Sequence, residues 1–143
     1  MRILGALGAI GLFSLLSIAS LQAADRAQSW PLRLGSTILG NTVQNLQGEE
    51  LGTLNDLVVN PADNRVVYGV LASGGLLGLG EKLFAVPLSA LQRAAKVDTW
   101  LLDINQERLK QAPEFNPHNW PQVTDRQWIT SVYTFYGLQP YWE

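Results

Sequence analysis

The chain has 143 residues, no cysteine and a formal net charge of −2 at pH 7, from 10 Lys and Arg against 12 Asp and Glu. The lack of cysteine excludes a disulfide framework, a thiolate nucleophile and a cysteine-based metal site. A mildly acidic balance without a basic stripe also argues against binding to a phosphate backbone, so we expect no nucleic-acid partner.

The first 24 residues have the pattern of a secretory signal peptide. Arg2 gives a minimal positive start, Ile3–Ile18 is uncharged and apolar, and Ser20–Ala24 supplies small residues for a cleavage point. The alternative is an uncleaved membrane anchor, because the position three residues before the cut fits the A-x-A pattern poorly. We favour cleavage, since the apolar stretch is shorter than the ~20 residues that span a bilayer. This predicts a periplasmic or secreted protein of about 120 residues, without a stable membrane span.

The middle of the chain alternates strand-like runs with turn residues. In Asn60–Asn64 (NPADN), Pro61 presets φ for a turn, and Asp63 or Asn64 tolerates the left-handed conformation that closes it. This segment therefore predicts a β-hairpin between the runs on either side. A short helical turn is expected over Leu88–Gln92. The expected strands are Ser36–Val43, Leu51–Val59, Arg65–Ala72, Leu83–Val86 and Asp98–Ile104.

The strand after the predicted hairpin lacks clean alternation. Val66, Tyr68 and Val70 would line one of its faces. Val67 and Leu71 are nevertheless apolar on the other, where a solvated antiparallel strand would be polar. A small barrel fills its interior with one set of side chains. Something outside the barrel must therefore cover the other set.

The last third of the chain changes character and predicts helices. Asn105 can cap a short helix over Gln106–Gln111, and Thr124 begins a T-x-x-Q capping box for a second helix. Gly137 stands where that helix would end. Eight of the 13 aromatic residues lie after position 113. We therefore expect residues 106–143 to cover the exposed face of the barrel.

Short motifs occur in a fixed order along the middle of the chain: Leu39-Gly40, Leu51-Gly52, Asp56–Val59, Gly74–Gly80 and Ala85-Val86-Pro87. With them, residues 36–105 resemble the PRC-barrel domain family, named for the cytoplasmic domain of the photosynthetic reaction-centre H subunit. The resemblance implies a small, mostly antiparallel β-barrel used as a binding and assembly scaffold, with no catalytic residues. The expected fold class is mainly β, with a short helical, aromatic-rich C-terminal extension. The expected organisation is a signal peptide (1–24), an irregular lead-in (25–35), the barrel (36–105) and the extension (106–143).

Two features that could carry chemistry have simpler interpretations. The glycine-rich run Gly74–Gly80 is not a phosphate loop, because Glu81 intrudes before Lys82 and no helix follows to face an anion. The sole histidine, His118, lies in a predicted loop without an orienting partner for acid–base work. We therefore expect no catalytic, metal-binding or cofactor-binding residues, and no cofactor.

The candidate partner contacts fall in two groups, and neither points to a particular partner. They are Leu76, Leu77 and Leu79 of the glycine-rich run, and Trp120, Tyr141 and Trp142 of the aromatic tail. The tail aromatics either pack on the barrel or remain exposed as anchors; packing is favoured. The predicted function is a non-catalytic periplasmic scaffold that binds an unknown envelope protein. The alternative is a small-ligand module with a pocket between barrel and extension. A free strand edge would also permit homo-oligomers.

Overall fold

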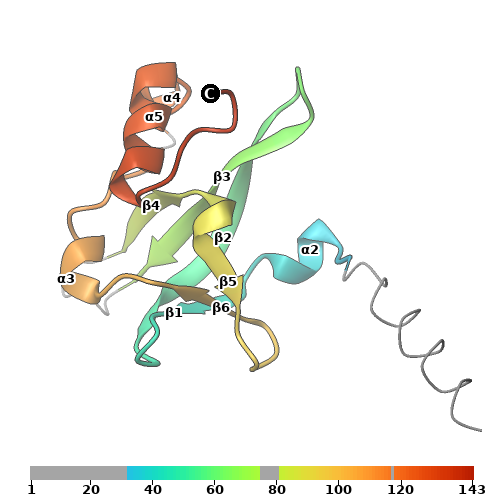
Figure 1. The fold of residues 1–143 in the computed structure, drawn as a ribbon, viewed down its shortest axis with the longest axis vertical. Coiled ribbons are helices and arrows are strands. Elements are labelled where there is room, and N and C mark those ends of the chain that lie inside the picture. The colour runs from blue at the N-terminus through green and yellow to red at the C-terminus, as the bar shows by residue number, and fades with distance from the viewer. Residues whose placement is uncertain (1–31, 75–80, 117) are drawn as a thin grey trace, which may run out of the picture. The chain divides into compact units, whose positions relative to one another are not determined.

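The computed structural model describes residues 32–74, 81–116 and 118–143, and Arg33–Glu143 forms a compact unit (Figure 1). Its strands are β1 (Thr42–Gln44), β2 (Glu50–Asn60), β3 (Arg65–Ser73), β4 (Lys82–Val86), β5 (Leu91–Arg93) and β6 (Thr99–Leu102). Its helices are α2 (Gly35–Ile38), the 3-10 turn η1 (Leu88–Ala90), α3 (Gln106–Leu109), α4 (Trp120–Val123) and α5 (Arg126–Phe135). Within the described ranges, no helix has the length and apolarity needed to cross a membrane.

The six strands form one curled sheet in the spatial order β4-β3-β2-β1-β6-β5 (Figure 1). The β1–β6 pairing is parallel and the other four are antiparallel. β2 is the longest strand; its first residues pair with β1, and β3 pairs along most of its length. The mainly β, barrel-like fold with a short C-terminal helix is therefore confirmed.

The predicted hairpin between β2 and β3 is confirmed. Asn64 has the left-handed φ of 57°. The Asn60 side chain accepts a hydrogen bond from the backbone N–H of Ala62 at 3.0 Å, and the Asp63 side chain accepts one from Arg65 at 3.2 Å. These local bonds stabilise the turn that the Pro, Asp and Asn residues predict.

Two bulges in the β2–β3 pairing decide where side chains point. Asn55 of β2 and Val67 of β3 are skipped in the register, and such bulges bend a sheet and interrupt its alternation. Val67 therefore packs with Tyr68 and Val70. The expectation from simple alternation was wrong for this residue, because it paired Val67 with Leu71, which lies in the other cluster.

Two expected elements are also corrected. The strand expected over Ser36–Val43 is helical in its first half, where the Thr37 N–H and hydroxyl both donate to the Leu34 carbonyl, at 3.0 and 2.8 Å. Gly40 (φ 82°) then turns the chain into β1. The helical turn expected over Leu88–Gln92 ends at residue 90, where β5 begins. A three-residue strand has no readable period; β5 exists because it pairs with β6.

Hydrophobic clusters cover both faces of β3, where residues 67–71 are all buried, as the missing alternation predicted. The first cluster fills the curl of the sheet and includes Val43, Leu51, Leu54, Leu71, Phe84 and Leu102. The second joins the sheet to α5 and includes Tyr68, Val70, Ala85, Ile129, Val132 and Tyr133. The Tyr68 hydroxyl donates to the Val123 carbonyl at 2.8 Å, and the Tyr133 hydroxyl donates to the Val67 carbonyl.

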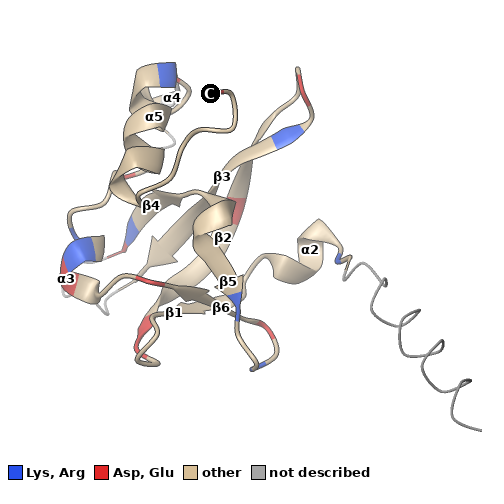
Figure 2. Ribbon diagram, in the orientation of Figure 1, with Lys and Arg blue, Asp and Glu red and all other residues tan. Residues whose placement is uncertain are grey.

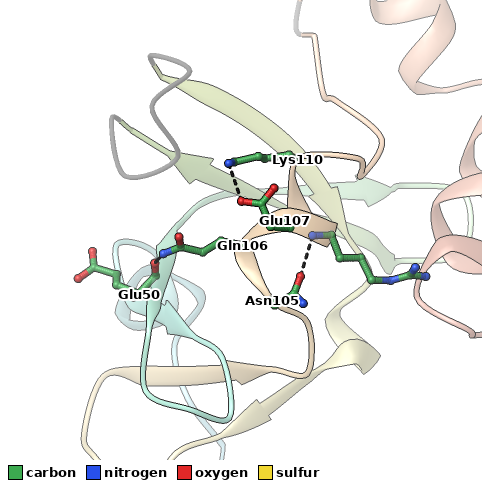
Figure 3. A network of polar contacts seen from close by, with 6 residues as sticks. Glu50, Asn105, Gln106, Glu107 and Lys110 are labelled. Atoms are coloured by element: carbon green, nitrogen blue, oxygen red, sulfur yellow. Dashed lines mark hydrogen bonds and ion pairs between the residues drawn. The ribbon is translucent and has the colours of Figure 1, made fainter.

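The α3 helix ties the sheet to α5. The Asn105 side chain caps α3 as predicted, accepting from the Arg108 backbone N–H at 2.8 Å (Figure 3). Gln106 donates to the Glu50 carbonyl at the start of β2 at 3.4 Å (Figure 3). The Arg108 guanidinium donates to the Phe135 carbonyl at the end of α5 at 2.8 Å, where a cation also offsets the helix dipole.

The capping of α5 differs from the prediction by one residue. Asp125 is the N-cap, because its carbonyl accepts the first helical bond and its carboxylate accepts from Trp128 N–H at 2.9 Å. Thr124, the expected cap, lies one position before it. The predicted end at Gly137 is confirmed: its φ is 71°, and its N–H donates to the Thr134 carbonyl at 3.0 Å.

Candidate binding groove

A groove of about 640 Å³ lies between the β2–β3 hairpin and the C-terminal residues. Its volume is in the range of small-molecule and peptide-side-chain sites. We call this site the groove. It is lined by Val58, Val59, Asn60, Pro61, Asp63, Val67, Val123, Thr124, Arg126, Ile129, Tyr141 and Trp142.

The hairpin forms one wall of the groove. Val59, at the end of β2, leaves 52% of its surface exposed although it is β-branched and apolar. Pro61 and Asp63, from the turn, extend this wall beyond the strands. The wall is held in place by the turn bonds and by the packing of Val67 under α5. It is therefore a preformed wall in which the valines are apolar and Asn60 and Asp63 add polar groups.

The opposite wall is built from the last residues of the chain. The Tyr141 and Trp142 rings meet edge to face with centroids 4.9 Å apart. The centroid of the Trp142 ring also lies 6.1 Å from that of Tyr133 in α5. The Asn60 amide donates to the Tyr141 hydroxyl at 3.4 Å, which links the two walls. Tyr141 and Trp142 are half-buried. Each ring therefore packs on the domain and still presents surface to the groove.

Two arginines stack on these rings. The Arg65 guanidinium lies 5.1 Å from the Tyr141 ring centroid, and that of Arg126 lies 5.1 Å from the Trp142 ring centroid. Among the described residues, neither has a carboxylate within ion-pair distance. Stacking uses the face of a guanidinium and leaves its in-plane N–H donors available. The lining of the groove thus combines apolar side chains with the Arg126 guanidinium and the Asp63 carboxylate, and Arg65 lies beside Tyr141. Blue segments mark the hairpin and the start of α5 in Figure 2.

The structure places the other predicted contact residues only in part. Leu76, Leu77 and Leu79 lie outside the described residues. Trp120 begins α4, but its side chain is also outside them. Of the six candidates, the structure brings together Tyr141 and Trp142.

The described part of the chain offers little for acid–base or metal chemistry. His118 is exposed, and its backbone N–H donates to the Asn116 side chain at 2.9 Å. No three His, Asp or Glu side chains gather among the described residues. Burial raises the pKa of Tyr68, Tyr133 and Tyr136 above the ordinary phenol value. These hydroxyls therefore remain protonated at neutral pH. Those of Tyr68 and Tyr133 donate to backbone carbonyls, whereas the buried Tyr136 hydroxyl has no partner among the described residues.

A second hollow, of about 400 Å³, lies between η1, residues 102–104 with Arg108 of α3, and the end of α5. Its cation, Arg108, already donates to the Phe135 carbonyl and lies 4.6 Å over the Phe135 ring. That guanidinium is committed to holding α3 against α5. The groove is therefore the better candidate for a partner.

Sequence reasoning missed the hairpin wall and both arginines. Val59 and Arg65 belong to an ordinary hairpin pattern, and Arg126 to an ordinary first helical turn. Their meeting with Tyr141 and Trp142 depends on the docking of the tail, for which the sequence carries no distance information. The available indication in the sequence was the apolar character of both faces of β3, which predicted that another segment covers the sheet.

Comparison with protein families matches the PRC-barrel domain over residues 32–109. The matched span contains all six strands and α3. No curated protein matches the chain. The second wall of the groove, which begins at Val123 and ends at Trp142, lies beyond the matched span.

Proposed function

Because the chain belongs to the PRC-barrel domain family, we propose that it is a non-catalytic module of the cell envelope that holds a segment of a partner protein in the groove. The curled sheet is the platform, and the C-terminal residues add the second wall. The apolar N-terminal segment Ile3–Ile18 supports export, with cleavage placing the protein in the periplasm and retention anchoring it to the membrane.

The observation that carries this proposal is the composition of the groove. Trp, Tyr and Arg are the residue types that contribute most to protein–protein binding, because they combine large apolar contact with directed hydrogen bonds. Here Trp142, Tyr141 and Arg126 line one preformed cavity, opposite the exposed Val59. Since both walls are already packed on the domain, little ordering is required on binding.

Site-specific photo-crosslinking in cells tests the proposal. A benzophenone amino acid at position 59, in the groove, is compared with one at Leu46, which is equally exposed but lies in the β1–β2 turn. We expect a discrete adduct from position 59 alone, and its loss when Trp142→Ala is added. Equal adducts from both positions, or none from position 59, would refute binding in the groove.

A second candidate is a small ligand in the same groove, which the volume of about 640 Å³ would accommodate. A ligand that binds the folded state alone, at a hundred times its Kd, stabilises that state by about 2.7 kcal/mol. Thermal unfolding of the purified chain with individual sugars and carboxylic acids measures this effect. A rise in Tm that disappears in Trp142→Ala would favour the small ligand; no rise with any compound would favour the protein partner.

A further inference from the structure

A second surface, remote in sequence from the groove residues, exposes aliphatic side chains. Leu34, Leu39 and Val97 leave 72%, 36% and 68% of their surfaces exposed. Leu34 and Leu39 flank α2, and Val97 lies in the turn between β5 and β6. None of these residues lines the groove.

The chain neighbours of these three residues line one small hollow. Arg33 and Ile38, next to Leu34 and Leu39, line it together with Arg93 and Asp98. The Thr42 N–H donates to the Asp98 carbonyl at 3.2 Å, which fixes the turn beside the start of β1. The two segments are therefore neighbours in space although some sixty residues separate them in the sequence. We call residues 33–39 and 93–98 the basal surface.

The basal surface is positive in a protein whose net charge is negative. It carries Arg33, Arg93 and Lys96, all exposed, and Asp98 is its one acidic residue. The ion pairs found in the described part of the chain are Lys82–Glu114 and Lys110–Glu107, so the three basal cations are not neutralised there. Figure 2 shows this as blue before α2 and on β5.

We propose that the basal surface rests on an anionic lipid bilayer. Exposed aliphatic side chains among unpaired Lys and Arg are the combination that binds the interface of an anionic membrane. In a chain that keeps the apolar segment Ile3–Ile18, the basal surface begins within 15 residues of the end of that segment, which would hold this surface near the bilayer. This inference does not depend on what occupies the groove.

Vesicle co-sedimentation tests the proposal with residues 33–143. This fragment forms a compact unit that contains both hydrophobic clusters. It lacks the apolar segment Ile3–Ile18, so that segment cannot contribute to binding. The probes are phosphatidylcholine vesicles with and without about 30% phosphatidylglycerol. We expect binding to the anionic vesicles, weakened as salt shortens the electrostatic range. Each cation contributes about fivefold in affinity. The triple variant Arg33→Gln, Arg93→Gln, Lys96→Gln is therefore expected to bind about a hundredfold more weakly.

A control removes positive charge elsewhere: the double variant Lys82→Gln, Lys110→Gln is expected to leave vesicle binding unchanged. The variant Leu34→Ser, Leu39→Ser, Val97→Ser is expected to lose binding while its circular dichroism stays that of the parent. Equal loss in the control, equal binding to uncharged vesicles, or no binding at all would overturn the proposal. A dimer in solution that the serine variant abolishes would assign the basal surface to a second copy and would also overturn it.

Discussion

Removal of the Tyr68 hydroxyl tests how the C-terminal segment is held on the sheet. Tyr68 is fully buried in β3, and its hydroxyl donates to the Val123 carbonyl at 2.8 Å. Its ring meets those of Phe115 and Trp128 edge to face, with centroids 6.1 and 5.8 Å apart. Tyr68→Phe keeps the ring but deprives a buried carbonyl of its donor, which costs about 1–3 kcal/mol. For a domain of this size a loss of roughly 2 kcal/mol lowers Tm by about 8 °C.

The matched control is Tyr141→Phe. Its hydroxyl accepts a weaker bond, 3.4 Å from the Asn60 amide, and the residue is half-buried, so we expect a change in unfolding free energy below about 0.5 kcal/mol. Urea unfolding monitored by circular dichroism gives both values. Equal effects of the two substitutions would refute the claim that the Tyr68–Val123 bond holds the segment.

The same residue predicts a dependence on alkaline pH. Burial raises the pKa of the Tyr68 phenol above its ordinary value near 10. The unfolded chain therefore releases this proton at a lower pH than the folded chain does, so stability is complete below about pH 10 and falls as the pH rises above it. Tyr68→Phe is expected to flatten this decline in urea unfolding between neutral pH and pH 11. An unchanged slope would contradict the assignment.

Three further changes test the sheet, the helix and the tail. Gly52→Ala would place a Cβ 2.2 Å from the Ala72 carbonyl oxygen, at a residue whose φ is 150°. We therefore expect a large loss of unfolding free energy in urea. Gly35→Ala, with open space around the new Cβ, should change the unfolding free energy little. Asp125→Ala removes the α5 N-cap and should cost about 1 kcal/mol by the same assay, with Asp125→Asn retaining most of the stability. Deletion of residues 113–143 uncovers the outer cluster; we expect aggregation on size exclusion, and a monomeric, equally stable product would show that the tail is not a cover.

Local chemistry was sufficient for much of the fold. The hairpin follows from Pro61 and Asn64, the α3 cap from Asn105 and the end of α5 from Gly137, because each depends on bonds within a few residues. The sequence-based prediction was wrong for elements whose pairing partners are distant in the chain. The β5 strand exists through its pairing with β6, and the side of Val67 depends on a bulge in the pairing with β2.

The groove, too, was indicated in part by the sequence and in part only by the structure. Composition marked Tyr141 and Trp142 as notable, since aromatics concentrate after position 113, but whether they pack or remain exposed was open. The structure shows them half-buried, with Arg65 and Arg126 stacked on them. Neither arginine is distinguished by its sequence context.

By itself the sequence determined a mainly β domain with two covered faces and a helical tail, because period, turn residues and caps are read locally. The resemblance of its ordered motifs indicated the PRC-barrel family, which the family comparison shows. The tertiary structure alone decided that the tail docks beside the hairpin to form the groove, and that α2 and the β5–β6 turn meet in the basal surface. Both surfaces join segments that are far apart in the chain. Their formation depends on packing free energy summed over the whole domain, which no local pattern encodes.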